Sequence, residues 1–146
     1  MDSGHRELVR SWLEKASHDL ETARRVIERE PPITDTAVYH CQQAAEKALK
    51  AVIIHHEQPV FKTHDLMALT THCANIDPDF RDWIDAAAIL TPYATHYRYP
   101  CNEPDPDLAE TVEAIDLASA LVGFVQHKLS ADGILGGHPG DPGDAQ

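Results

Sequence analysis

The segment that decides the fold is residues 39–54, YHCQQAAEKALKAVII. It contains neither glycine nor proline and is rich in alanine, lysine and glutamine, which all favour a helix. On a helix of about 3.6 residues per turn, its apolar side chains share one face with the preceding valine. These side chains are Val38, Cys41, Ala45, Ala48, Leu49, Val52 and Ile53. The segment therefore predicts a long helix with a buried face, and its alanines let a second helix approach closely.

Polar side chains occupy the rest of this predicted helix in two rows. One row, at spacings of three and four residues, consists of His40, Gln43, Lys47 and Lys50. Gln42 and Glu46 form the other row. One interpretation is that both rows are solvated faces of a core helix, as in most amphipathic helices. The other is that the first row belongs to a binding surface.

Charge favours the second interpretation in one respect. The chain has 146 residues and a formal net charge of −12, with 24 acidic and 12 basic side chains. This length suits a single domain, and the acidity excludes broad, non-specific binding to nucleic acid. Only four lysines or arginines occur between residues 31 and 97, and three of them lie on residues 39–54 or shortly after. Such local positive charge is a candidate anion site.

The sequence also indicates a compartment. No apolar run approaches the roughly 18 residues of a membrane span. The first residues, MDSGHREL, lack the apolar stretch of a signal peptide. We therefore expect a cytoplasmic protein without membrane contact. The cysteines Cys41, Cys73 and Cys101 are odd in number and widely spaced, which favours reduced thiols over a disulfide framework.

Further helices are predicted on both sides of residues 39–54. Apolar periodicity and helix-start signals predict helices over residues 6–29, 34–56, 66–76, 78–91 and 106–129. The expected capping residues are Thr34 or Asp35, Thr63 or His64, Asp77 and Asp105. No β-alternating run remains, and residues 130–146 are so rich in glycine and proline that we expect a disordered tail. The sequence predicts one all-α domain over residues 6–129, an up-and-down bundle of about five helices.

Four stretches in this order resemble the HEPN family (higher eukaryotes and prokaryotes nucleotide-binding). They are WLEKASHDLETA at 12–23, YHCQQAAEKALKAVI at 39–53, KTHDL at 62–66 and YRYP at 97–100. The resemblance implies a helical bundle related to the C-terminal domain of nucleotidyltransferases, and commonly a homodimer. It also implies a separate minimal nucleotidyltransferase as partner in a toxin–antitoxin or defence setting. No cofactor is implied.

Many HEPN proteins are metal-independent ribonucleases with an arginine followed four to six residues later by histidine. Arg98 has no histidine in that range, nor do the arginines of the first predicted helix. We therefore predict no catalytic residue, and the resemblance points to nucleotide or RNA-like anion binding. The expected binding residues are His40, Gln43, Lys47, Lys62, His64, Tyr97 and Arg98. Lysine and arginine would hold phosphates together with the first backbone N–H groups of the third helix, and a tyrosine would stack on a base.

Other interpretations stay open at this point. Arg98 pairs with Glu46 if its role is structural, and His64 and Asp65 then only cap a helix. A degenerate ribonuclease would use a histidine near the matching stretches as acid or base. A purely structural dimerisation module is the third alternative. Ten histidines suggest metal binding, but no zinc-site spacing occurs, and the adjacent His55 and His56 should point in different directions on a helix. We therefore predict no metal site.

Overall fold

The computed structural model describes residues 3–100 and 102–133, and all regular structure in this part of the chain is helical. The helices are α1 (Ser3–Glu28), α2 (Thr34–His55), α3 (Leu66–Ile76), η1 (Pro78–Trp83), α4 (Ile84–Leu90), η2 (Thr91–Ala94) and α5 (Leu108–Ala131), where η marks a 3-10 helix. The prediction of an all-α bundle of about five helices is confirmed.

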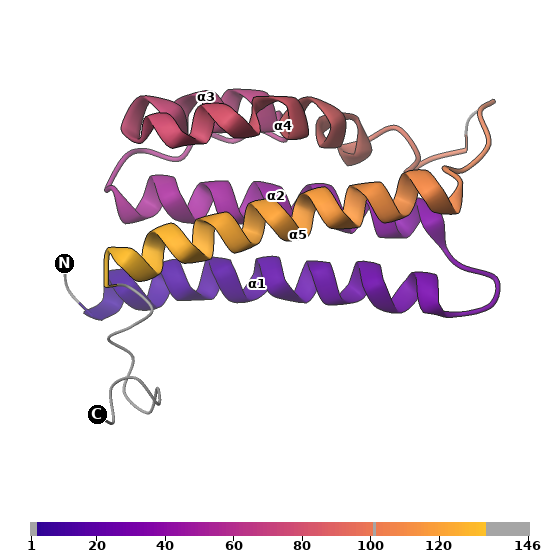
Figure 1. Ribbon diagram of the computed structural model, residues 1–146, viewed down its shortest axis with the longest axis horizontal. Helices are drawn as coiled ribbons and strands as arrows, with labels where there is room; N and C mark the ends of the chain where they lie inside the picture. The colour runs from indigo at the N-terminus through magenta and orange to yellow at the C-terminus, as the bar shows by residue number, and fades with distance from the viewer. Residues whose placement is uncertain (1–2, 101, 134–146) are drawn as a thin grey trace.

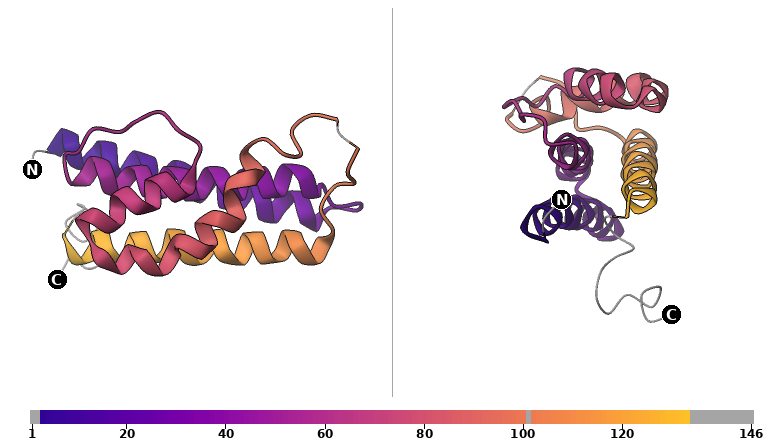
Figure 2. Two further views of the ribbon diagram at one scale, coloured as in Figure 1. Left: turned by 90° about the horizontal axis from the view of Figure 1, so that it is seen from above. Right: turned by 90° about the vertical axis from the view of Figure 1, so that its left-hand side faces the viewer.

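The bundle has α2 at its centre. The long helices α1, α2 and α5 lie roughly along one axis, and α3 and α4 form a layer above them (Figure 1). Seen end-on, α1 lies on one side of α2, the α3–α4 layer on the opposite side, and α5 on a third (Figure 2). The fourth side of α2 carries no helix from the described residues. A ligand could therefore reach α2 from this side.

Burial along α2 follows from that position. All seven residues of the predicted apolar face are buried, and so are the alanines on the other faces, Ala37, Ala44 and Ala51. Helices can approach closely where side chains are this small. The aromatic part of the core lies beneath η1, where the rings of Phe80 and Phe124 meet edge to face at 5.1 Å. Alanines thus set the tight centre of the fold and larger side chains fill its periphery.

Three predicted helix caps are wrong and one is right. The N-cap of α2 is Ile33, which offers no side-chain cap. Asp65 rather than its two predecessors caps α3 by accepting hydrogen bonds from two backbone N–H groups. Asp107 rather than Asp105 caps α5. Asp77 caps the next helix as predicted, but that helix begins as the 3-10 helix η1 before continuing as α4. For these three helices, the polar residues near the helix start were recognised, but the residue at which the helix begins was not.

The remaining predictions concern the thiols, the tail and the membrane. Cys41 and Cys73 are free and buried, and burial raises the pKa of each thiol to about 12, which leaves it protonated and unreactive. Cys101 lies outside the described residues.

Helix α5 continues to Ala131, two residues into the predicted tail, and residues 134–146 are not described. Within the described residues, no helix combines the length and the apolar character that crossing a bilayer requires.

Candidate functional site

Partly exposed side chains on α2 follow one stripe along its uncovered side. Apart from the first turn and Ile54, they are Tyr39, His40, Gln43, Lys47 and Lys50, which we call the α2 stripe. The rest of the helix is buried. The polar row predicted at spacings of three and four is therefore the part of the central helix that reaches solvent. Beyond the first turn, a ligand of this helix would contact it mainly along that stripe.

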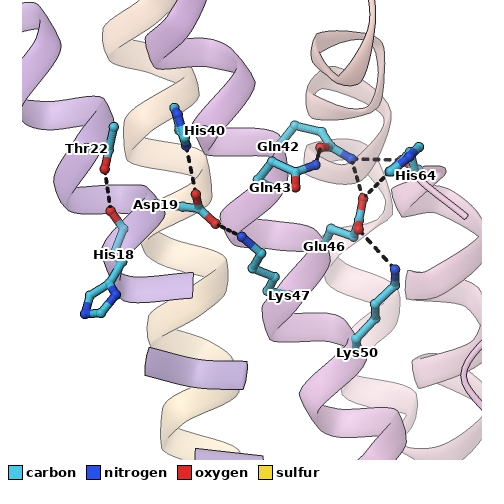
Figure 3. Close-up of polar contacts among 10 residues, drawn as sticks. All are labelled: His18, Asp19, Thr22, His40, Gln42, Gln43, Glu46, Lys47, Lys50 and His64. Carbon is cyan, nitrogen blue, oxygen red and sulfur yellow. Dashed lines mark hydrogen bonds and ion pairs between the residues drawn. The ribbon is translucent and has the colours of Figure 1, made fainter. Parts of the chain in front are cut away.

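One carboxylate of α1 organises the middle of the α2 stripe. Asp19 is buried, and its two oxygens accept hydrogen bonds from His40 Nδ1 at 2.8 Å and from Lys47 Nζ at 2.6 Å (Figure 3). An ionised carboxylate only accepts, so Nδ1 of His40 carries the hydrogen. His40 and Lys47 are thus fixed by one anion, which neutralises much of the positive charge on this part of the stripe.

A second carboxylate, on α2 itself, repeats the arrangement. Glu46 is 5% exposed and accepts from His64 Nδ1 at 2.8 Å and from Lys50 Nζ at 3.0 Å. Gln42, fully buried, donates to Glu46 at 3.2 Å and to the backbone carbonyl of His64 at 2.9 Å. The loop of residues 56–65 runs back along α2 and ends at this point (Figures 2 and 3). Glu46 and Gln42 therefore hold that loop on the helix.

These partners decide the charge state of both carboxyl groups. Burial alone would raise the pKa of Asp19, but the hydrogen bonds from His40 and Lys47 outweigh it and lower the pKa below its usual value. Burial would likewise raise the pKa of Glu46, and the hydrogen bonds from His64, Lys50 and Gln42 again produce a net lowering. Both groups are ionised at neutral pH and stabilise the fold in that form.

We expect the unfolding midpoint, Tm, to fall as the solution is acidified. Because each folded pKa is depressed, the stabilisation is complete above the unfolded values of 3.8 for Asp19 and 4.5 for Glu46. It is lost as the pH falls through the lower folded values. Thermal unfolding followed by circular dichroism between about pH 7 and about pH 3 measures the loss. The double variant Asp19→Asn, Glu46→Gln should show a flatter profile, and an unchanged slope would contradict the assignment.

Arg98 occupies a different position, beside the first turns of α2. Its guanidinium carbon lies 4.7 Å from the centroid of the Tyr39 ring and 5.9 Å from that of Tyr99. Within the described residues, no acceptor bonds to the guanidinium. A hollow of about 230 Å³ adjoins it, lined by Asp35, Thr36, Tyr39, Tyr97 and Arg98. Arg98 is thus held by ring faces while its donors stay available.

The loop that carries Arg98 is fixed by aromatic contacts. Tyr93, in η2, donates from its hydroxyl to Glu110 of α5 at 2.6 Å. The rings of Tyr93 and Tyr97 stack at 6.1 Å, and the His96 ring meets Tyr97 edge-on at 4.5 Å. These contacts place Tyr97 beside Arg98 in the lining of the hollow. The predicted aromatic loop is therefore packed against the bundle at one end and exposed at the other.

The seven predicted residues fall into separate groups. Tyr97 and Arg98 share the hollow, whereas His40, Gln43 and Lys47 lie on the α2 stripe. His64 is joined to Glu46, and Lys62 is exposed two residues earlier in the loop. The 230 Å³ hollow and its 310 Å³ neighbour at Arg98 include none of Lys47, Lys62 and His64. Tyr39 and Glu46 are seven residues apart on α2, so these groups lie about 10 Å apart along the helix axis.

The sequence of the chain matches the profile of the HEPN domain family over residues 9–128. The chain belongs to the HEPN family. Among solved structures, this HEPN domain is similar to TT1696 from Thermus thermophilus, with 32% identity over 82% of this chain and 97% of that chain, at a TM-score of 0.68. It is also similar to ST0689, an archaeal HEPN homologue, with 25% identity over 82% and 96% of the two chains, at a TM-score of 0.64. No curated protein matches its sequence.

Two structural expectations for this HEPN domain are wrong. Glu46 pairs with Lys50 and His64, so it is not the partner of Arg98. The first backbone N–H groups of α3 are already used, because Asp65 accepts from two of them and the Thr91 hydroxyl accepts from that of Leu66. They are therefore not available to a phosphate.

Four residues of the site in this HEPN domain were not among the predicted binding residues. They are Asp19, Tyr39, Gln42 and Glu46. Asp19 carried no signal beyond being one of several acidic residues on the first predicted helix. Gln42 and Glu46 did carry one, since alanines on several faces of a helix indicate that neighbours surround it. A polar row on such a helix is more often buried and paired than solvated.

Proposed function

We propose that this HEPN domain binds a nucleotide unit, free or within single-stranded RNA, at the Arg98 hollow and along the α2 stripe. One observation carries the proposal, namely that the Arg98 guanidinium is oriented by Tyr39 yet bonded to no acceptor of the described residues. Arginine presents a planar fork of donors that fits phosphate oxygens in pairs. The lysines of the α2 stripe are less available, since each already binds a carboxylate.

The hollow offers partners for the rest of a nucleotide. Tyr39 and Tyr97 present rings on which a base can stack, and such stacking contributes about 1–3 kcal/mol per base. Asp35 lines the same hollow and offers a carboxylate that accepts from a ribose hydroxyl or a base amino group. This acceptor would repel a bare anion, so the hollow favours a nucleotide over inorganic phosphate. A second unit of an RNA strand would reach His64 and Lys62.

A direct titration tests the proposal. Fluorescence anisotropy of a labelled single-stranded RNA of about eight nucleotides is measured against protein concentration, with ATP, GTP and inorganic phosphate as competitors. Saturable binding that weakens with salt supports the proposal, and the competitors separate RNA from free nucleotides. If inorganic phosphate competes as well as ATP at the same concentration, the site binds anions in general and does not recognise a nucleotide. Absence of binding to every probe would overturn it.

The two histidine–carboxylate pairs favour a second candidate, a degenerate metal-independent ribonuclease. His40 and His64 each bond to a carboxylate through Nδ1, which directs the other ring nitrogen outward as a potential acid or base. The same labelled RNA, run on a denaturing gel after incubation with chelator, gives the readout. Cleavage by the unmodified chain that disappears in His64→Ala would establish ribonuclease activity. If the RNA stays intact, only the binding function remains as a candidate.

We also propose that the domain forms a homodimer and works with a separate minimal nucleotidyltransferase, in a toxin–antitoxin or defence setting. Exposed apolar side chains on the contacting helices α4 and α5 support the dimer: Ile89, Leu108 and Val112 are 43%, 51% and 41% exposed. A specific pair buries on the order of 1,600 Å² in total. Light scattering should give twice the chain mass, and a larger species after mixing with the purified nucleotidyltransferase. A monomer at micromolar concentration would contradict the dimer.

A further inference from the structure

Two helices end side by side at the end of the bundle remote from Arg98. Both α2 and α5 finish at the left of Figure 1, with His55 as the last residue of α2 and Asp132 as the C-cap of α5. The Nε2 atom of His55 lies 3.0 Å from Oδ2 of Asp132. His56 joins them, and one ligand atom from each of the three lies within 4.8 Å of the other two. Two imidazoles from the end of α2 and a carboxylate from the end of α5 thus lie together, although they are distant in sequence.

The end of α2 explains why adjacent histidines converge. The backbone N–H groups of Glu57 and Gln58 donate back to carbonyls in the last turn, at 2.9 Å and 3.1 Å. Glu57 adopts a left-handed conformation with φ of 57°, as is typical of the residue after a helix. His56 therefore leaves the helical path, and its ring centroid lies 4.7 Å from that of His55. The expectation that the two rings point in different directions is wrong, because the helix stops between them.

We propose that His55, His56 and Asp132 bind a divalent transition-metal ion of the zinc class. Imidazole nitrogen and carboxylate oxygen are the donors that Zn²⁺ accepts, and three protein ligands leave a fourth position for water. The ion would join the ends of α2 and α5. This site lies apart from the proposed nucleotide site, so neither proposal depends on the other.

The dimensions of the cluster fit such an ion after small side-chain movements. Bonds of about 2.0–2.1 Å in a tetrahedral arrangement separate two ligand atoms by about 3.3 Å. The His55–Asp132 separation of 3.0 Å is already close to this value. His56 and Asp132 are exposed, so their side chains can rotate to close the remaining distance. In the metal-free protein the carboxylate of Asp132 only accepts, so Nε2 of His55 carries the hydrogen, and ligation through Nε2 would displace it. Nδ1 of His55 has no partner among the described residues and could carry the hydrogen instead.

The electrostatic surroundings favour a cation. Both α2 and α5 direct their C-terminal ends, which carry partial negative charge, toward the cluster. The cation in the neighbourhood, Lys128, is already paired with Asp77 at 2.9 Å and with Asp79. A hollow of about 340 Å³, lined in part by His56, Asp77, Lys128 and Asp132, adjoins the cluster and has room for water on an open metal position.

Calorimetric titration of the full chain tests this site. Protein freed of metal with a chelator is titrated with Zn²⁺, and Co²⁺ is added separately because its visible absorption reports the coordination geometry. We expect one ion per chain, a raised Tm with bound Zn²⁺, and a tetrahedral or five-coordinate Co²⁺ spectrum. His56→Ala should weaken binding by roughly 100-fold or more, since it removes a ligand from an exposed position.

Matched controls separate the site from scattered surface histidines. His127→Ala removes an exposed histidine of α5 outside the cluster, and His138→Ala removes one beyond the described residues. Both should bind Zn²⁺ like the unmodified chain, whereas Asp132→Asn should bind it at least tenfold more weakly. Equal binding by His56→Ala and the unmodified chain would overturn the proposal, as would an octahedral Co²⁺ spectrum or the absence of binding.

Discussion

Arg98→Ala should weaken binding of single-stranded RNA or nucleotide by about 10- to 100-fold. Charge-assisted hydrogen bonds to a phosphate contribute about 1.5–3 kcal/mol, and every 1.4 kcal/mol corresponds to about a factor of ten. The guanidinium makes no other polar contact within the described residues, so its donors are free to supply that energy. The measurement is the same anisotropy titration at fixed salt. Repeating it at several salt concentrations should show a shallower slope, by about one phosphate contact.

Stability separates binding from structure at this position. Removing Arg98 costs its contact with the Tyr39 ring, about 0.5–1 kcal/mol at an exposed site, and the longer contact with the exposed Tyr99 ring, so Tm should change little. Arg81→Ala is the matched control, because it removes another exposed arginine, in η1 away from the hollow. It should leave affinity within about twofold. If Arg98→Ala instead lowers Tm by many degrees and leaves affinity unchanged, Arg98 is structural and the proposed function fails.

Glu46→Ala should destabilise the domain by about 3 kcal/mol, which lowers Tm by about 10 °C for a chain of this size. The substitution leaves Lys50, whose side chain is 11% exposed, without its anion. Gln42 is fully buried and loses one of its two acceptors. A buried charge or amide left without a partner costs more than the lost hydrogen bond itself. Thermal and urea unfolding of the purified variant give the change.

Two variants calibrate that loss. Glu46→Gln keeps the shape and one carbonyl acceptor, so it should cost less than the alanine variant while still losing the charge. Glu14→Ala removes an exposed carboxylate from α1 and should change stability by less than about 0.5 kcal/mol. Equal Tm values for Glu46→Ala and Glu14→Ala would show that the cluster contributes nothing to the fold, and the account of the loop at His64 would be wrong.

Most of the architecture follows from the periodicity of the sequence. The apolar positions around residues 39–54 repeat at helical spacing, and each of them is buried. The stripe of His40, Gln43, Lys47 and Lys50 was predicted from spacing alone and is the uncovered side of α2. Prolines and the cap at Asp77 also marked boundaries correctly. These features depend on local rules, namely propensity, spacing and the missing N–H of proline.

The site required information that spacing does not contain. Whether the row of Gln42 and Glu46 faces solvent depends on where residues 56–65 return, and a loop leaves no periodic signal. The partner of Arg98 depends on the packing of the aromatic loop against the start of α2. His55 and His56 converge because the helix ends between them, which is a property of one backbone conformation. Long-range pairing, rather than local preference, decided each of these outcomes.

The central position of α2 determines how this domain can respond to a ligand. A helix that packs on α1, α3 and α5 through small side chains cannot shift without opening gaps against some of these helices or clashing with others. Adjustment is therefore left to the two segments that fold back onto it, residues 56–65 and 95–100. We therefore expect ligand binding to move these two segments relative to α2 and to leave the packing of the helices unchanged.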